Sequence, residues 1–211
     1  MKNYIITISR TYGSGGKTVG KMLAEKLGIK YYDREILRLA SDESGINEAL
    51  FGQADEQLQS TSLFRIAKKA FTGQLIAPDN DDFVSNDNLF NYQAKIITDL
   101  AKEESCVIIG RCADHILKNY KNAIRIFCYA PLDSCIKRDM EQNGHTKHES
   151  MKIIAEKDKH RSEYYKYYTG QQWDSASNYD MCINTASLSY EEILNVVKSF
   201  VDLVKNRNDA E

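Results

Sequence analysis

The hydrophobic positions of the chain fall into two patterns that alternate along its length. Short apolar runs, typical of buried strands, lie at residues 4–8, 29–32, 106–109, 123–130 and 179–185. Apolar residues at helical spacing lie at 19–27, 58–71, 90–102, 113–117, 151–168 and 191–204, with further helix starts at 33 and 131. A strand, a helix and a second strand within residues 4–32 form a βαβ unit, which implies parallel strands. The pattern therefore predicts an α/β fold with a parallel central sheet.

Two segments depart from this alternation, and both are predicted to belong to a single domain spanning 1–211. Residues 42–92 are the least regular part, with an expected helix at 58–71 and an exposed loop at 73–88. We interpret them as a helical insertion suited to cover a substrate. Residues 138–172 carry a long, highly charged helix. Such a helix is usually solvated, but its basic residues also suit a mobile lid that closes over a polyphosphate.

A glycine-rich turn connects the first strand to the first helix. It matches the second half of the phosphate-binding pattern G-x-x-x-x-G-K-[ST], while Thr11 takes the place of the first glycine. Glycines let backbone amides approach a ligand closely, and the helix N-terminus adds unpaired N–H groups and a positive dipole end. We therefore expect nucleotide phosphates to bind at Gly13, Ser14, Gly15, Gly16, Lys17 and Thr18. Lys17 would reach the β- and γ-phosphates and the Thr18 hydroxyl would ligate Mg²⁺. The alternative is a strand–helix turn without a ligand.

Charged residues directly follow two of the predicted strands. Asp33 and Arg34 come after the strand at 29–32, and Arg111 comes after the strand at 106–109. The carboxyl ends of parallel strands form the ligand crevice of an open α/β sheet, so these residues are candidate substrate ligands. The planar fork of an arginine suits a phosphate. The alternatives are a helix N-cap for Asp33 and a structural salt bridge for Arg111.

Composition and charge narrow the class of protein. The chain is 27% charged and 42% hydrophobic with a net charge of −2, which indicates a globular protein without a field that recruits nucleic acid. No apolar run approaches the roughly 20 residues of a membrane span, and the first strand leaves no room for a signal peptide, so we expect a cytoplasmic protein. The five cysteines lack paired spacing and are expected to pack structurally, Cys182 included. The sequence leaves homo-oligomerisation open.

Several motifs, taken in order along nearly the whole chain, resemble those of the cytidylate kinase-like family. These proteins are relatives of the bacterial cytidylate kinases among the P-loop nucleoside monophosphate kinases. The matching motifs are Ile8–Gly16 (ISRTYGSGG), Tyr32–Glu35 (YDRE), Gly110–Asp114 (GRCAD), Tyr129–Leu132 (YAPL), Asp158–Arg161 (DKHR), Tyr164–Gly170 (YYKYYTG) and Asn178–Asp180 (NYD). The resemblance implies a three-layer α/β/α P-loop kinase fold with a parallel central sheet, a helical insertion and a helical lid.

The resemblance also implies a reaction, namely transfer of the γ-phosphoryl group of ATP to CMP or dCMP with Mg²⁺. The implied catalytic residues are Lys17 and two lid arginines, Arg138 and Arg161. The implied acceptor-binding residues are Asp33 and Arg34 beside the nucleotide, Arg111 on its phosphate and Asp158 near its sugar or base. Phosphoryl transfer depends on positioning and charge neutralisation, which such a set of cations supplies.

Two questions stay open at the level of sequence. The chain is predicted to be a nucleotide kinase for cytidylate, a P-loop kinase for another small-molecule acceptor, or a non-catalytic nucleotide-binding protein. Cys112 stands where cytidylate kinases place an aspartate, and 42–92 differs from the usual acceptor-binding insert, so the second hypothesis is retained. The aromatic segment 164–170, with Trp173, is equally suited to stack a base or to pack the lid helix on the body.

Overall fold

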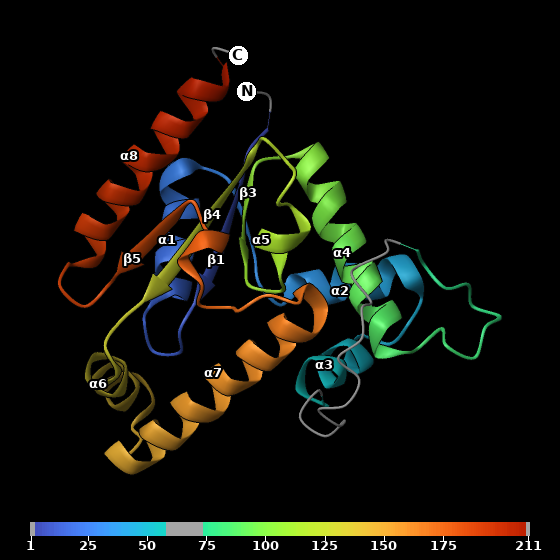
Figure 1. The fold of residues 1–211 in the computed structure, drawn as a ribbon, viewed down its shortest axis with the longest axis horizontal. Helices are drawn as coiled ribbons and strands as arrows, with labels where there is room; N and C mark the ends of the chain where they lie inside the picture. Colours follow the sequence, from blue (N-terminus) through green and yellow to red (C-terminus); the bar gives the residue numbers. More distant parts are fainter. Residues whose placement is uncertain (1–2, 58–73, 210–211) are drawn as a thin grey trace.

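The computed structural model describes residues 3–57 and 74–209, and a five-stranded sheet lies at its centre (Figure 1). All four strand pairings are parallel, in the order β2-β3-β1-β4-β5. The strands are β1 (Ile5–Arg10), β2 (Lys30–Tyr32), β3 (Cys106–Ile109), β4 (Ala123–Tyr129) and β5 (Met181–Asn184). The predicted parallel α/β sheet is confirmed, since each apolar run contains one strand.

Helices cover both faces of the sheet and make the three predicted layers. They are α1 (Gly16–Leu27), α2 (Glu35–Ser44), α3 (Glu48–Gln57), α4 (Asn86–Glu103), α5 (Ala113–Ile116), α6 (Leu132–Asn143), α7 (Lys147–Thr169) and α8 (Tyr190–Asp209), with a 3₁₀ turn at Ala176–Asn178. Ile6 and Ile8 of β1 pack with α1 and α8, whereas Ile5 packs with α2, α4 and α5. The alternation of side chains along a strand thus builds one core on each face.

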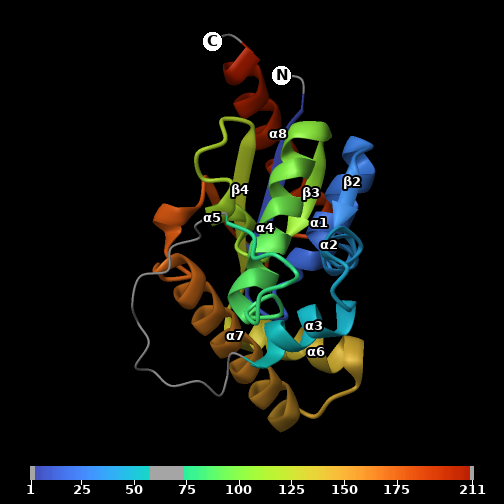
Figure 2. The ribbon, with the colours of Figure 1, turned by 90° about the vertical axis from the view of Figure 1, so that its right-hand side faces the viewer.

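The helices that depart from the alternating pattern gather at one end of the sheet. α7 crosses below the carboxyl ends of the strands, and α3 and α6 lie at the same end, while β1 begins and α8 ends at the opposite end (Figures 1 and 2). In the segment predicted as an insertion, α2 ends at Ser44, with Gly45 as its C-cap, and α3 begins at Glu48. The helix expected at 58–71 lies outside the described residues.

Two helices start earlier than their apolar spacing predicts, because capping side chains set their first turns. α4 begins at Asn86, inside the stretch predicted as a loop, where the Ser85 hydroxyl accepts the amide of Asn88. α7 begins at Lys147, where Thr146 and Glu149 form a capping box. The apolar spacing locates the buried face of a helix, whereas the capping side chains decide the residue at which the helix begins.

The aromatic segment of α7 packs this helix against the body. Tyr165, Tyr168 and Trp173 are buried, and Tyr168 stacks on Phe90 of α4 with 3.9 Å between ring centroids. The Tyr165 hydroxyl donates to the buried carboxylate of Asp114, at 2.6 Å. Burial and the Asp114 charge raise the pKa of Tyr165, so the hydroxyl keeps its proton. Most of the aromatic segment therefore anchors the helix, and Tyr164 is left at the edge of a cavity.

The cysteines differ from expectation at one position. Cys106, Cys112, Cys128 and Cys135 are buried, as predicted for packing residues, but Cys182 is exposed. Cys182 lies on β5, the edge strand, where one face meets solvent, so its apolar neighbours in sequence do not imply burial. The described residues contain no group of three His, Cys, Asp or Glu side chains placed to hold a metal ion. No described helix is long and apolar enough to cross a bilayer.

Substituting Tyr165 with Phe tests the attachment of α7. The change keeps the buried ring and removes one hydrogen bond to a buried carboxylate, so the free energy of unfolding should fall by about 1.5–3 kcal/mol. Tyr167→Phe on the same helix removes a surface hydrogen bond to Asp87 and should cost less than about 0.5 kcal/mol. Urea unfolding of both variants measures the difference. Equal losses in the two variants would show that the Tyr165–Asp114 contact does not hold the helix.

Candidate active site

The glycine-rich turn forms the first half of the site. β1 ends at Arg10 and α1 begins at Gly16, as the motif predicts. Gly15 has a left-handed backbone (φ 81°), and a Cβ at this position would lie 2.6 Å from the Tyr190 hydroxyl. Gly15, the N-cap of α1, has no side chain to cap the helix, and the Ser14 hydroxyl accepts the amide of Gly16 at 3.4 Å. The amides that follow in the first turn have no partner within the helix. Lys17 is exposed at this open helix end, and the turn is therefore suited to bind phosphate.

Side chains from α6 and α7 hold this turn from the outside. The guanidinium of Arg138 donates to the carbonyl oxygens of Ser14 (2.8 Å) and Gly13 (3.3 Å), and also to Thr185. Asp158 accepts the amide of Tyr12 at 2.8 Å. Arg138 and Asp158, both predicted from resemblance to face substrate, thus contact the backbone of the loop.

A buried carboxylate supports the same loop from behind. Asp139 of α6 accepts hydrogen bonds from the Tyr12 hydroxyl (3.2 Å) and Asn143 Nδ2 (2.7 Å), and it pairs with His145 Nδ1 at 2.9 Å. Burial alone would raise the pKa of Asp139, but the hydrogen bonds from His145, Asn143 and Tyr12 outweigh it and lower the pKa. Asp139 therefore stays ionised in the folded protein and fixes the position of the Tyr12 ring.

The second half of the site lies at the carboxyl ends of β2 and β3. Asp33 follows β2, and its carboxylate pairs with Lys17 Nζ at 2.6 Å. Arg111 follows β3, donating from Nε to the Asp33 carbonyl (3.0 Å) and from Nη1 to Gln93 (2.9 Å). The N-cap position of α2 belongs to Arg34, without a side-chain cap bond, so a capping role for Asp33 is wrong. Its carboxylate instead forms the ion pair with Lys17, whose side chain is largely exposed.

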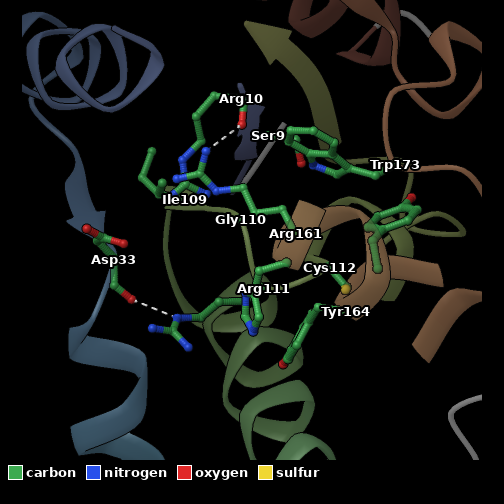
Figure 3. A pocket seen from close by; sticks show the side chains of 12 residues that line it. Ser9, Arg10, Asp33, Ile109, Gly110, Arg111, Cys112, Arg161, Tyr164 and Trp173 are labelled. Atoms are coloured by element: carbon green, nitrogen blue, oxygen red, sulfur yellow. Dashed lines mark hydrogen bonds between the residues drawn. The ribbon is translucent and has the colours of Figure 1, made fainter. Parts of the chain in front are cut away.

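The backbone after β3 is unusual and fixes where Arg111 points. Gly110, Arg111 and Cys112 have φ values of 68°, 57° and 54°, three successive residues in the left-handed region. Such a conformation is costly for residues other than glycine and is found where surrounding structure enforces it, often at functional sites. The turn directs the Arg111 side chain across the strand ends toward Asp33 (Figure 3).

A cavity lies between these strand ends and α7. It is lined by Ser9, Arg10, Asp33, Ile109, Gly110, Arg111, Cys112, His160, Arg161, Tyr164, Tyr165 and Trp173, most of which Figure 3 labels. Arg161 of α7 pairs with Asp158 at 2.9 Å and donates to the Arg10 carbonyl at 3.3 Å. Three arginines and one aspartate therefore line a single cavity next to the phosphate-binding turn, which favours an anionic ligand.

The structure brings most of the predicted site residues together and adds one. Lys17, Asp33, Arg111 and Arg161 meet around the cavity and the turn, whereas Arg34 is exposed and does not line the cavity. Sequence reasoning missed Arg10 as a site residue. The signal that could have found it is a long cationic side chain within the loop motif, at the end of an otherwise buried strand.

Comparison with known proteins places the chain in a family. The cytidylate kinase-like family profile matches residues 5–187. The chain belongs to this family. Cytidylate kinase from Pyrococcus horikoshii is 27% identical over 98% of this chain and 92% of its own length. Cytidylate kinase from Methanopyrus kandleri is 25% identical over 97% of this chain and 96% of its own length.

Solved structures agree on the fold. An uncharacterised protein from Eubacterium ventriosum has a TM-score of 0.68 at 26% identity, covering 95% of this chain and 99% of its own. Shikimate kinase from Bacteroides thetaiotaomicron has a TM-score of 0.54 at 13% identity, with coverages of 94% and 98%. A gluconokinase from Sinorhizobium meliloti has a TM-score of 0.53 at 14% identity, with coverages of 99% and 97%. These structures confirm the predicted P-loop kinase fold. The family match and the curated relatives confirm the predicted enzyme class, a phosphotransferase.

The Asp139 network predicts a pH-dependent loss of stability. The folded pKa of Asp139 lies below its unfolded value, so its contribution is complete above the unfolded pKa of about 4 and is lost as the pH falls through the folded pKa. Asp139→Asn should therefore destabilise the protein at pH 7 by about 1–3 kcal/mol, and less at pH 3. Chemical unfolding between pH 7 and pH 3 measures this.

Glu141→Gln, an exposed change on the same helix, serves as the control and should lie within about 0.5 kcal/mol of the wild type. A gap between Asp139→Asn and the wild type that stays constant with pH would rule out the ionised carboxylate as its source.

Proposed function

We propose that the protein transfers the γ-phosphoryl group of ATP to a nucleoside monophosphate, with CMP or dCMP as the acceptor. The observation that carries this proposal is the cavity with three arginines beside a phosphate-binding turn. Transfer of a phosphoryl group between two phosphorylated molecules requires two adjacent anion-binding sites, one for each molecule. The names of the archaeal relatives, cytidylate kinases, support the choice of acceptor.

On the donor side, the turn at residues 13–18 would hold the phosphates of ATP. The open amides of α1 and the exposed Lys17 fit the β- and γ-phosphates, and the Gly15 position leaves no room for a side chain. The Thr18 hydroxyl would supply a hard oxygen donor of the kind that Mg²⁺ prefers. Mg²⁺, when bound, would neutralise charge that develops on the transferring group. Arg138 contributes by holding the loop carbonyls in place.

On the acceptor side, Arg111 would hold the phosphate of the nucleotide. Its guanidinium is already oriented by the Asp33 carbonyl and by Gln93, so little side-chain entropy is lost on binding. Arg161 would neutralise charge between the two phosphates, since it reaches the Arg10 carbonyl from α7. Asp158 would act through Arg161 and through the Tyr12 amide. Tyr164 and Trp173, at the cavity wall, offer aromatic surface to a base, and the exposed Arg34 is the weakest of the acceptor assignments.

One observation favours a second candidate, a kinase for a small hydroxylated acceptor. Asp33 lines the cavity beside Lys17, where its carboxylate would also accept a proton from an attacking hydroxyl group. Asp33→Asn separates the two candidates. A hydroxyl acceptor would lose turnover by roughly 10²–10⁴-fold because it depends on a general base, whereas a phosphate acceptor, whose oxygen is already ionised, would lose less.

The test of the proposal is an ADP-release assay with each nucleoside monophosphate in turn. CMP or dCMP should give turnover, and Lys17→Ala should lower kcat by at least roughly 10²-fold because charge stabilisation in the transition state is lost. Arg161→Met should cost a similar factor, whereas Lys159→Met, an exposed change on the same helix, should leave kcat within about twofold.

Turnover with no nucleoside monophosphate above the Lys17→Ala background would contradict the proposed acceptor class. Thermal stabilisation by ATP without turnover on any acceptor would instead indicate a nucleotide-binding protein without catalysis.

A further inference from the structure

Arg10 is a cation without a described partner in a cavity that already holds two other arginines. Its guanidinium makes no hydrogen bond or salt bridge to any residue in the described ranges, although the side chain is half-buried. The guanidinium of Arg161 lies beside it in Figure 3, with Arg111 on the opposite side of the cavity. By contrast, Arg111 is held by Asp33 and Gln93, and Arg161 by Asp158.

Such an arrangement costs free energy unless a ligand completes it. Burial and the like charges of Arg161 and Arg111 lower the pKa of Arg10 to about 10, although Asp33 partly opposes the shift. A second polar group is also left open in this cavity, because the buried Nε2 of His160 has no hydrogen-bond partner in the described chain. Two unsatisfied groups that line one cavity are what an anion with several oxygen atoms would satisfy.

The surrounding backbone is shaped to leave Arg10 in this position. Its aliphatic stem packs on Gly16, where an added Cβ would lie 2.7 Å from Arg10 Cβ. Its guanidinium lies over Gly110, where an added Cβ would lie 2.4 Å from Arg10 Nη1. Gly16 at the start of α1 and Gly110 after β3 thus make room for one arginine side chain. A surface arginine that merely avoids solvent would need neither.

The charge of the cavity indicates what the anion is. Arg10, Arg111, Arg161 and the neighbouring Lys17 carry four positive charges against two negative charges, on Asp33 and on Asp158, which leaves an excess of two. A phosphate monoester carries close to two negative charges at neutral pH. A neutral, hydroxylated acceptor would leave this excess uncompensated in a half-buried site.

We propose that Arg10, made accessible by Gly110, is a direct ligand of the acceptor phosphate, together with Arg111 and Arg161. The acceptor is then a phosphate monoester, and its phosphate lies at the carboxyl ends of β1 and β3, in the cavity that His160 also lines. This inference rests on the proposed function for the identity of the reaction, but the anion site itself does not. The loop that binds the donor would, through Arg10, also bind the acceptor.

Arg10→Met tests this role, because Met keeps the stem that packs on Gly16 and removes the fork. Relative to the wild type, Arg10→Met should raise the KM for CMP roughly 10–100-fold, whereas the KM for ATP should change less than about twofold. Arg10→Lys, which keeps the charge, should restore part of the affinity for CMP. A rise in the KM for ATP alone, or no change in either KM, would overturn the proposal.

A binding measurement separates failure of this inference from failure of the proposed function. Inorganic phosphate is titrated calorimetrically into the protein with ADP present in excess, so that the donor turn is occupied. Phosphate should bind the wild type and bind Arg10→Met at least roughly tenfold more weakly. This readout requires no turnover, so it decides the role of Arg10 even if no nucleoside monophosphate is phosphorylated. Equal binding by both proteins, or none by the wild type, would contradict the site.

Gly110→Ala tests whether Gly110 provides the space for the Arg10 guanidinium, because this variant keeps Arg10 itself. Gly110 and Gly28 both have left-handed backbones, with φ of 68° and 64°, but nothing lies within 4 Å of a Cβ added at Gly28. Both alanine variants therefore carry similar backbone strain, and only Gly110→Ala displaces the Arg10 guanidinium. Phosphate affinity should fall in Gly110→Ala and stay within about twofold of the wild type in Gly28→Ala. Equal affinities in the two variants would show that Gly110 does not serve Arg10.

Discussion

The order of strands in the parallel sheet is the constraint on which the site depends. Because β2, β3 and β1 are neighbours and run in the same direction, the residues that follow them meet at one edge. Asp33, Arg111 and Arg10 come from three separate parts of the sequence, yet they line one cavity. The helix that follows β1 adds its open N-terminus to the same edge. The meeting of these charged side chains at one edge is therefore a consequence of topology.

The helices around this edge, α6 and α7, hold charged side chains in fixed positions. Arg138 is held by carbonyl oxygens of the loop, and Asp158 shares its carboxylate between Tyr12 and Arg161. α7 is tied to the body by the Tyr165–Asp114 hydrogen bond and by stacked aromatic rings. Because these contacts order the cations before any ligand arrives, binding would cost little conformational entropy. Catalysis of phosphoryl transfer also depends mainly on charges that are already in position before the reaction.

Local sequence patterns predicted the sheet, the glycine-rich turn and the class of ligand, because each depends on residues that are close in sequence. The βαβ pattern of residues 4–32 implies parallel strands. The Gly-Lys-Thr segment marks the start of a helix, and α1 begins there, at Gly16. Contacts between distant segments were not predictable in this way. Arg138 meets Ser14 from 124 residues away, and the space for Arg10 depends on the left-handed Gly110. The Asp33 carboxylate does not cap α2, as the sequence suggested, but pairs with Lys17 of another element.

The central claim is that the donor and acceptor anion sites lie side by side at this edge, and one binding measurement tests it most directly. A molecule in which adenosine and cytidine are joined 5′ to 5′ through a polyphosphate bridge can occupy both sites at once. Calorimetry should give a Kd at least roughly 10²-fold lower for this molecule than for ATP or CMP alone, because the second site is filled intramolecularly. A Kd no lower than that of ATP would contradict the account, since only one site would then be present.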